Sequence, residues 1–217
     1  SDTPAFPGPP PAVDEPSRES MDTTHLSVVD GHGGAVALTT TLNGLFGCKA
    51  WVPGFGFLNN EMDDFAAAPG VANLYGLVQG EANAVGPGKR MLSSMSPTIA
   101  WNEAGEAVAV GGRGGSRIPT ATMQILLALL VDGDELQAAV DRPRVHHQWL
   151  PDVIRHEPDA LSPETRAALE ARGHELEEVG SVAVAHAVRL LAGGTAEAAA
   201  DPRRPPSTAA VVKPSPR

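Results

Sequence analysis

Two strand-like segments separated by four glycine-rich residues constrain the fold of this chain more than any other feature. Residues 24–30 and 35–42 are rich in valine, leucine and threonine, which favour β-strands. Between them, Gly31-His32-Gly33-Gly34 provides glycines for the positive-φ positions of a tight turn. The sequence therefore predicts an antiparallel hairpin near the start of the folded part of the chain.

Further strands and helices are predicted behind this hairpin. Residues 120–131 are strongly apolar, as in a buried helix, and Ser162 followed by Pro163 is a helix start with Ser as N-cap. This order of elements predicts an α+β fold in which helices cover sheets. The other predicted elements are a glycine- and aromatic-rich loop at 44–56, a hairpin of 96–101 and 106–110 around a turn at 102–105, a short helix at 135–140, the end of the Ser162 helix at Gly173, and a strand at 182–190.

Proline-rich segments flank this region. Residues 1–22 and the segment from about Asp201 onward have the composition of linkers. The 217 residues therefore divide into a lead-in at 1–22, one folded domain at 23–200 and a tail at 201–217.

The charge and the residue counts exclude several classes of function. A formal net charge of −10 argues against binding to nucleic acid or to anionic membrane surfaces. No apolar run approaches the roughly 20 residues that a membrane-spanning helix needs. The single cysteine, Cys48, cannot form an internal disulfide, and we expect it to be a small buried residue.

The first strand begins with a threonine pair, directly after a polar segment that ends at Asp22. A threonine before a strand is usually only a β-former. A threonine hydroxyl is a weak nucleophile, but cleavage of the chain before Thr23 would free an α-amine that can act as its base. That amine would have a pKa of about 7.7–8.0. While Asp22 is attached, the same nitrogen is an amide and cannot serve.

Three polar stretches contain candidate functional residues. Residues 59–65 form an acidic cluster that could be a solvated turn or a metal site, although its spacing fits no calcium loop. Ser93 and Ser94 can be simple loop residues. Residues 111–117 resemble a phosphate loop but lack its lysine and following hydroxyl residue, so backbone N–H groups that bind an oxyanion are the better interpretation. The adjacent His146 and His147 are predicted to be structural.

Taken together, these stretches resemble the gamma-glutamyltransferases (gamma-glutamyl transpeptidases), which are N-terminal-nucleophile hydrolases. The resemblance runs from about Thr23 to Glu178 in five stretches that keep the order of the family. It implies the four-layer αββα sandwich, with this chain as the small catalytic subunit and 1–22 as the end of the large-subunit region. Gly112-Arg113 departs from the serine-proline often found there, which puts the rigidity of that loop in doubt.

The resemblance also implies roles for individual residues. Thr23 would be the nucleophile, Thr41 would bind its amine, and the N–H groups of Gly114 and Gly115 would bind the oxyanion. Asn43, Glu61 and Asp64 would hold the α-amine of the donor. Ser93 and Ser94 would bind its α-carboxylate together with an arginine of the large subunit, and Tyr75 would be the gate of a flexible lid. The cleavage site would be the Asp22–Thr23 bond.

The reaction so implied is γ-glutamyl transfer from glutathione or a similar donor to water, an amino acid or a peptide, with no metal and no cofactor. The partner would be the large subunit of the same precursor. The resemblance implies a location in the periplasm or outside the cell, and a cytoplasmic location is the alternative. Two alternatives remain. One is a related acylase for glutaryl or cephalosporin-type amides, and the other is a non-catalytic family member or fragment.

Overall fold

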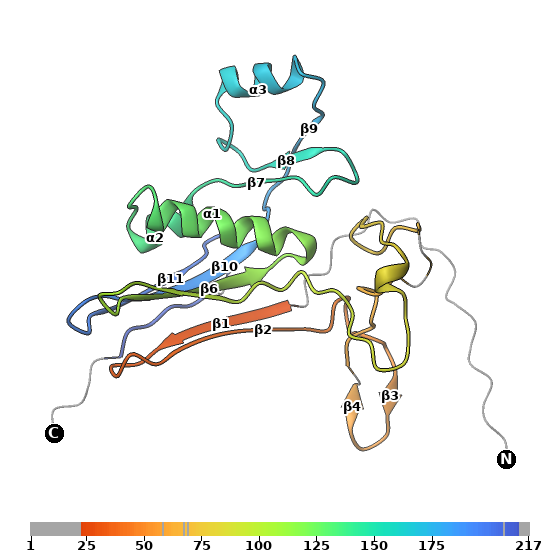
Figure 1. Cartoon of the computed structure of the whole chain (residues 1–217), viewed down its shortest axis with the longest axis horizontal. Helices are drawn as coiled ribbons and strands as arrows, with labels where there is room; N and C mark the ends of the chain where they lie inside the picture. Colours follow the sequence, from red (N-terminus) through yellow and green to blue (C-terminus); the bar gives the residue numbers. More distant parts are fainter. Residues whose placement is uncertain (1–22, 58, 67, 69, 206, 213–217) are drawn as a thin grey trace.

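The computed structural model describes residues 23–57, 59–66, 68, 70–205 and 207–212. The predicted lead-in, including Asp22, lies outside these residues. The elements in chain order are β1 Thr23–Val29, β2 Ala35–Thr41, β3 Trp51–Val52, β4 Gly56–Phe57, a 3-10 turn at Glu81–Asn83, β5 Thr98–Trp101, β6 Ala107–Arg113, a 3-10 turn at Gly115–Arg117, α1 Ile118–Leu130, α2 Leu136–Asp141, β7 Val145–His146, β8 Ile154–His156, α3 Pro163–Glu170, β9 Leu176–Glu178, β10 Val184–Leu190 and β11 Ala196–Ala200 (Figure 1).

The predicted first hairpin is confirmed. β1 pairs antiparallel with β2, and Thr23 and His25 lie opposite Thr41 and Thr39. Since cross-strand partners share a face, the four side chains point to the same side of the hairpin, as the alternation of the sequence predicts. In the turn, Asp30 Oδ1 accepts hydrogen bonds from two backbone N–H groups, which fixes the connection between the strands.

Three layers form the body of the molecule (Figure 1). Four antiparallel strands lie in the order β11-β10-β6-β5. Helices α1 and α2 cover one face of this sheet, where the aliphatic side chains of the core gather around Ile125, Val110 and Val140. The β1–β2 hairpin packs on the other face, mainly against β6 and β10. The described residues thus have an α-β-β arrangement, and the predicted α+β fold is confirmed.

The two sheets approach closely because β6 carries small side chains. Its residues from Ala107 to Gly112 are buried. A β-carbon placed on Gly111 would lie 2.4 Å from Cε1 of His25 on β1. Glycine is therefore needed at this position for the hairpin to lie flat on the sheet.

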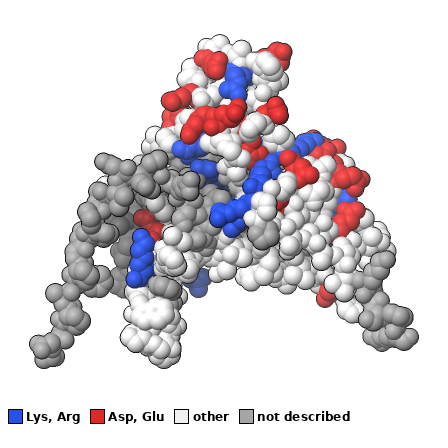
Figure 2. All heavy atoms as spheres, turned by 180° about the vertical axis from the view of Figure 1, so that it is seen from behind, with Lys and Arg blue, Asp and Glu red and all other residues white. Residues whose placement is uncertain are grey.

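The outer face of the hairpin is apolar and exposed. The side chains between the inward positions of β1 and β2 are Leu26, Val28, Val36 and Leu38, each about half exposed. Figure 2 shows few charged side chains on the lower part of the molecule, whereas acidic and basic residues intermix on the lobe that carries α3. No helix in the described part of the chain is long and apolar enough to cross a bilayer.

Several sequence predictions need correction. The predicted loop at 44–56 contains β3, which pairs with β4. Cys48 is exposed rather than buried. Strand β6 continues to Arg113, so the glycine-rich loop begins only at Gly114. The small sheet β7-β8-β9 and strand β11 were not predicted, because each of these strands depends on partners that are distant in the sequence.

The start of the predicted tail is also more ordered than its composition indicates. Asp201 is 1% exposed, and its Oδ2 lies 2.9 Å from Nη1 of the equally buried Arg144. Arg203 bonds to both Asp201 and Glu157. This buried group of charges attaches the end of β11 to the core. The division of the chain at residue 200 itself stays a prediction.

Candidate active site

Thr23 begins β1 with its hydroxyl against that of Thr41. The two Oγ1 atoms lie 2.8 Å apart, and the Thr23 side chain is buried. Asn43 donates its backbone N–H to Thr41 Oγ1 at 2.9 Å. Because that bond occupies an acceptor site of Thr41, the Thr41 hydroxyl can direct its own proton to Thr23. The end of the hairpin therefore orients the hydroxyl that is predicted to be the nucleophile.

A small cavity lies beside this hydroxyl pair. Most of the predicted site residues meet here, although the chain separates them by up to 92 positions. Glu61, Ser93 and Gly114 do not line the cavity wall. The lining residues are Thr23, Thr41, Asn43, Asp64, Tyr75, Ser94, Met95, Gly115 and Ile118.

The Asn43 amide and the Asp64 carboxylate line the polar side of the cavity, and the Glu61 carboxylate lies behind the amide. Asn43 is buried in a left-handed conformation with φ of 68° and donates its Nδ2 to Glu61 Oε1 at 3.1 Å. Glu61 is therefore connected to the cavity by its hydrogen bond with Asn43, which lines it. Burial raises the pKa of the Asp64 carboxyl to about 6, and the neighbouring charges of Asp63 and Glu61 add to this effect. A cation placed in the cavity would favour the ionised form of Asp64.

The glycine pair that follows β6 adopts conformations that favour glycine. Gly114 has φ of 147° and Gly115 has φ of 57°. A β-carbon on Gly114 would lie 2.9 Å from Cβ of Ala183, so its backbone lies tightly against the segment before β10. This turn directs the chain from the buried sheet into α1 and places Gly115 in the cavity wall.

Tyr75 closes another side of the cavity. The side chain is 7% exposed, and its hydroxyl lies 3.5 Å from the carbonyl oxygen of Asn43. Gln148 donates to the Tyr75 carbonyl oxygen at 2.8 Å and accepts from Ser116 at 2.6 Å. Because its ring is buried, Tyr75 does not belong to an ordinary exposed surface loop. Its role as the gate of a lid stays a prediction.

A second set of buried polar groups was not predicted. His25, two residues after Thr23 on the same face of β1, bonds through Nδ1 to Thr39 at 2.7 Å and through Nε2 to Ser27 at 2.8 Å. Burial lowers the pKa of its imidazole to about 4, and the charge of His186 adds to the shift. The alternation of β1 could have placed His25 beside Thr23, but only the structure shows its partners.

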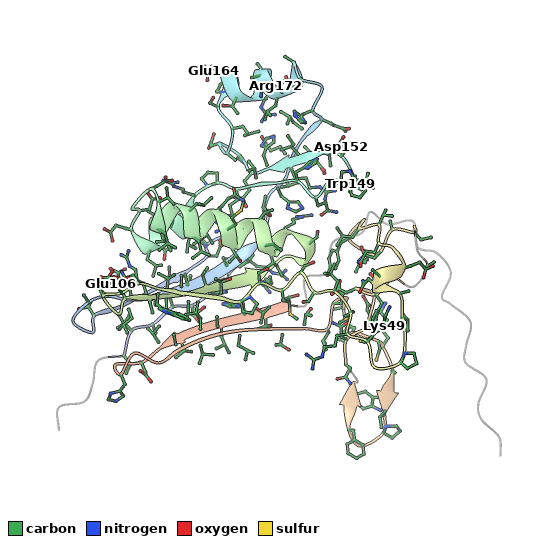
Figure 3. The ribbon with its side chains drawn as sticks, viewed as in Figure 1. Lys49, Glu106, Trp149, Asp152, Glu164 and Arg172 are labelled. Atoms are coloured by element: carbon green, nitrogen blue, oxygen red, sulfur yellow. The ribbon has the colours of Figure 1, made fainter. Side chains whose placement is uncertain are left out.

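No group of three histidine, cysteine, aspartate or glutamate side chains in the described part of the chain could hold a metal ion. His146 is bonded to Thr120 and Gln148. His147 pairs with Asp152 near the surface, where Figure 3 shows Asp152 beside Trp149. The two histidines thus have separate partners. The absence of a metal from the reaction stays a prediction.

Comparison with known proteins identifies one family. The family model described as gamma-glutamyltranspeptidase matches residues 3–211. The chain is 49% identical over 179 residues to a glutathione hydrolase proenzyme of Pseudomonas sp. (strain A14), with 82% of this chain and 31% of the relative covered. It is 46% identical over 186 residues to the glutathione hydrolase proenzyme of Escherichia coli (strain K12), with 85% and 32% covered.

The solved structures agree with this result. The gamma-glutamyltranspeptidase from Pseudomonas nitroreducens complexed with L-DON is 45% identical and has a TM-score of 0.79, with 88% of this chain and 100% of that chain covered. The match covers the whole of that structural chain. By contrast, this chain spans only about a third of the length of the two curated relatives.

Proposed function

The chain belongs to the gamma-glutamyltranspeptidase family, and on that premise we propose that it is the small, catalytic part of a precursor that cleaves itself before Thr23. The cleaved enzyme transfers the γ-glutamyl group of glutathione or a related amide to water, an amino acid or a peptide. The observation that carries this proposal is the contact of 2.8 Å between the hydroxyls of Thr23 and Thr41, two residues that line the cavity.

Cleavage begins with the Thr23 hydroxyl. Its oxygen attacks the Asp22 carbonyl carbon, the C–N bond breaks, and the residue 22 acyl group moves from the nitrogen to the oxygen of Thr23. Water then hydrolyses this ester. The products are a carboxylate on Asp22 and a free α-amine on Thr23. That amine is the base that the uncut chain lacks.

Catalysis uses the same hydroxyl against the γ-amide of the donor. The Thr23 oxygen attacks the amide carbonyl carbon, and its proton passes to the Thr23 amine. The N–H groups of Gly114 and Gly115 stabilise the oxyanion, since preorganised donors favour the charge that develops in the transition state. The C–N bond then breaks, the amine returns the proton to the leaving nitrogen, and cysteinylglycine departs from glutathione. The product on the enzyme is a γ-glutamyl ester of Thr23.

The second half of the reaction removes the ester. Water or the amine of an acceptor attacks its carbonyl carbon and gives a proton to the Thr23 amine. The Thr23 oxygen then leaves and takes this proton from the amine. Hydrolysis gives glutamate and transfer gives a new γ-glutamyl amide. Both outcomes regenerate the hydroxyl and the free amine of Thr23.

Recognition of the donor rests on its charged amino acid end. Asp64 in the cavity and Glu61 behind Asn43 offer two carboxylates and an amide to the α-ammonium group. Charge-assisted hydrogen bonds of this kind are the strong ones. Ser94 lies in the same cavity and, with Ser93, offers hydroxyl groups to the α-carboxylate. The large-subunit part of the precursor completes this site.

An acylase for glutaryl-type amides is the second candidate, because the fold alone does not separate the two reactions. Its substrate has no α-amine and does not need acidic groups beside Asn43. The position of Asp64 in the cavity therefore favours the γ-glutamyl donor.

The test uses the complete precursor that contains this chain. Mass spectrometry should find a cut before Thr23 in the unaltered protein and none in Thr23→Ala. The cleaved protein should release the chromophore from a γ-glutamyl anilide. Cleavage of the alanine variant at this bond would contradict self-processing. Residues 1–217 produced alone should not turn over the anilide, and an ordinary turnover rate by that chain would show that the site is complete without a partner.

A further inference from the structure

The side-chain amide of Gln148 joins two parts of the wall of the Thr23 cavity. Its Nε2 donates to the carbonyl oxygen of Tyr75 at 2.8 Å, and its Oε1 accepts from the hydroxyl of Ser116 at 2.6 Å. Tyr75 lines the cavity, and Ser116 directly follows Gly115, which lines it too, in the oxyanion turn of residues 114–117. Gln148 itself is not among the described residues that line the cavity. It therefore touches the site only through these neighbours.

The amide uses its full hydrogen-bonding capacity in this position. Nε2 also donates to the carbonyl oxygen of Leu150 at 3.0 Å, and Oε1 also accepts from Nε2 of His146 at 2.9 Å. A side-chain amide has two N–H bonds and two acceptor sites, so none is left over. Because carbonyl oxygens can only accept, a reversed amide would place its own oxygen against those of Tyr75 and Leu150. The orientation of Gln148 is therefore fixed by its surroundings.

The two segments that Gln148 joins are also in direct contact with each other. A β-carbon on Gly115 would stand 2.3 Å from Cε1 of Tyr75, so the ring lies on the backbone of the oxyanion turn. The next residue, Gly76, has φ of 75°, and a β-carbon there would stand 3.2 Å from Cδ of Pro151 and 3.8 Å from Nε2 of Gln148. The chain around Tyr75 thus packs both on the oxyanion turn and on the residues next to Gln148.

The Tyr75 segment, residues 73–77, has internal bonds that do not involve Gln148. Asn73 Oδ1 accepts from the backbone N–H groups of Tyr75 and Leu77, each at 3.0 Å. The Asn73 N–H donates to the carbonyl oxygen of Leu77, also at 3.0 Å. The shape of the segment is therefore fixed from within. What the Gln148 amide adds is its position relative to the oxyanion turn.

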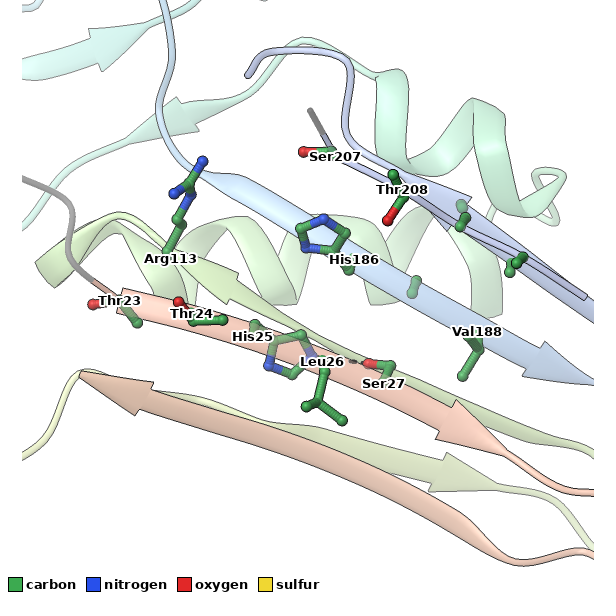
Figure 4. A pocket seen from close by; sticks show the side chains of 15 residues that line it. Thr23, Thr24, His25, Leu26, Ser27, Arg113, His186, Val188, Ser207 and Thr208 are labelled. Carbon is green, nitrogen blue, oxygen red and sulfur yellow. Dashed lines mark hydrogen bonds between the residues drawn. The ribbon is translucent and has the colours of Figure 1, made fainter. Parts of the chain in front are cut away.

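Thr23 borders a second hollow as well, which runs along β1 and where Figure 4 shows it with His25 and His186. Neither Gln148 nor Ser116 is among the described residues that line that hollow. The contacts of Gln148 therefore connect it to Thr23 on the side of the small cavity, where the γ-glutamyl group of the donor is proposed to bind.

We propose that Gln148 is a positioning residue that holds the Tyr75 segment on the oxyanion turn while the donor is bound. Through its N–H groups it fixes the Tyr75 wall around the γ-glutamyl group, which favours the bound donor and the transition state alike. Through its oxygen it fixes Ser116 and the neighbouring N–H of Gly115, which matters only when the oxyanion forms. The proposal deepens the γ-glutamyl transfer described above and rests on it.

The two arms of the amide can be removed separately in the complete, cleaved enzyme. The readouts are kcat for a γ-glutamyl anilide and the inhibition constant Ki of glutamate, the hydrolysis product, which fills the donor site without forming an oxyanion. Gln148→Glu keeps an oxygen for Ser116 but loses both N–H groups and turns an oxygen toward two carbonyl oxygens. The Ki of glutamate should therefore rise about tenfold, the size of one lost hydrogen bond, with kcat nearly unchanged.

The second arm is removed by Ser116→Ala. This variant keeps the bond between Gln148 and Tyr75, so the Ki of glutamate should stay nearly the same. The kcat should fall about tenfold, because the oxyanion turn is less well held. Gln148→Met has a side chain of similar length without hydrogen bonds, and it should raise the Ki and lower kcat together. A residue that only supports the fold would not divide its effects in this way.

The matched control is Gln124→Glu. Gln124 is half-buried like Gln148, and its Nε2 donates to two carbonyl oxygens, those of Thr120 and Val145, each at 2.8 Å. The substitution therefore removes the same kind of bonds, but none of them reaches the Tyr75 segment. Both the Ki of glutamate and kcat should stay close to those of the unaltered enzyme.

The outcomes separate this proposal from the proposed function. An unaltered enzyme without anilide turnover contradicts γ-glutamyl transfer itself. In an active enzyme, an unchanged Ki of glutamate in Gln148→Glu overturns the role of the N–H groups, and an unchanged kcat in Ser116→Ala overturns that of the oxygen. Equal changes in Gln148→Glu and Gln124→Glu would also overturn the proposal. If Gln148→Glu is not cleaved before Thr23, Gln148→Met decides, and it contradicts the proposal if Ki and kcat both stay unchanged.

Discussion

The ring of Tyr75 lies so close to Gly115 that a β-carbon added to Gly115 would stand 2.3 Å from Tyr75 Cε1. Gly115 also has φ of 57°, where a side chain is strained. Gly115→Ala should therefore displace the ring and misplace the N–H group that we propose binds the oxyanion. We expect kcat for a γ-glutamyl anilide to fall by about 10²–10³, the usual effect of losing one such donor.

The control for this substitution is Gly105→Ala. Gly105 also has positive φ, 80°, but a β-carbon there would meet no atom within 4 Å. It should cost stability through the backbone alone and leave kcat nearly unchanged. If both alanine variants lost the same activity, the Tyr75 contact would have no special part in the site.

The hydroxyl contact between Thr23 and Thr41 can be tested with isosteric residues. Thr41→Val removes the oxygen that lies 2.8 Å from Thr23 Oγ1 and leaves the shape of the side chain. We expect kcat to fall about tenfold, in line with the loss of one hydrogen bond that orients the nucleophile. Thr41→Ser should retain most of the activity. Equal kcat values for the valine variant and the unaltered enzyme would mean that Thr41 does not assist Thr23.

The role of Asp64 separates γ-glutamyl recognition from an acylase. A site that holds an ammonium group rejects analogues without it, because its buried polar groups are then unpaired. Loss of one partner of such a pair costs about 2–5 kcal/mol. Asp64→Ala should thus lower kcat/KM for a γ-glutamyl donor about 30-fold or more. A glutaryl donor, which has no amine, should be affected much less.

Self-cleavage serves as the internal control for Asp64, since the ammonium group takes no part in it. The cut before Thr23 should therefore persist in Asp64→Ala. Equal losses of kcat/KM for both donors would make Asp64 a structural residue.

The buried imidazole of His25 should make stability depend on pH. Burial, with the charge of His186, lowers its folded pKa to about 4, whereas an unfolded histidine has a pKa of about 6.5. Between these values the unfolded chain takes up a proton and the folded chain does not. The free energy of unfolding should therefore decrease as the pH falls from about 6.5 to 4, by up to about 1.4 kcal/mol per pH unit.

Urea unfolding of the assembled protein at pH 7 and pH 5 measures this effect. His25→Gln should reduce the difference between the two midpoints, and the exposed His174→Gln should not. The prediction is wrong if His25→Gln leaves the pH dependence unchanged.

Asp201 should be important for stability although it lies in a proline-rich segment. Asp201→Asn leaves the Arg144 guanidinium, which is 1% exposed, without its carboxylate partner. Breaking a buried ion pair in this way costs about 3–5 kcal/mol. The matched change at the surface is Asp132→Asn, whose partner Arg142 is about half exposed, and there we expect no more than about 1 kcal/mol. Similar losses for both variants would contradict a special role for the buried group.

The elements that the sequence predicts well are those with local signals. The first hairpin has alternation and a glycine turn, and α1 is an apolar run behind a glycine turn. The strands β7, β8 and β9 have only two or three residues each and depend on distant partners. Asp201 was missed because composition averages over a segment and does not show that one carboxylate faces a buried arginine.

In the candidate site, too, residues that a local sequence stretch identifies were predicted, and residues that depend on distant partners were missed. The resemblance to the family supplied Asp64 and Ser94, and the structure brings both to the cavity of Thr23. Their catalytic and binding roles stay predictions. His25 was missed because a single histidine in a strand gives no sign of its partners until the register places it against Thr39 and Gly111.

The strand that begins with the predicted nucleophile turns its aliphatic side outward. Leu26, Val28, Val36 and Leu38 form a flat, water-exposed surface, and in the described part of the chain β1 has a strand partner on one edge only. Such a surface favours association between copies in concentrated solution. Poor solubility of residues 1–217 produced alone is therefore expected even when the chain has its native fold.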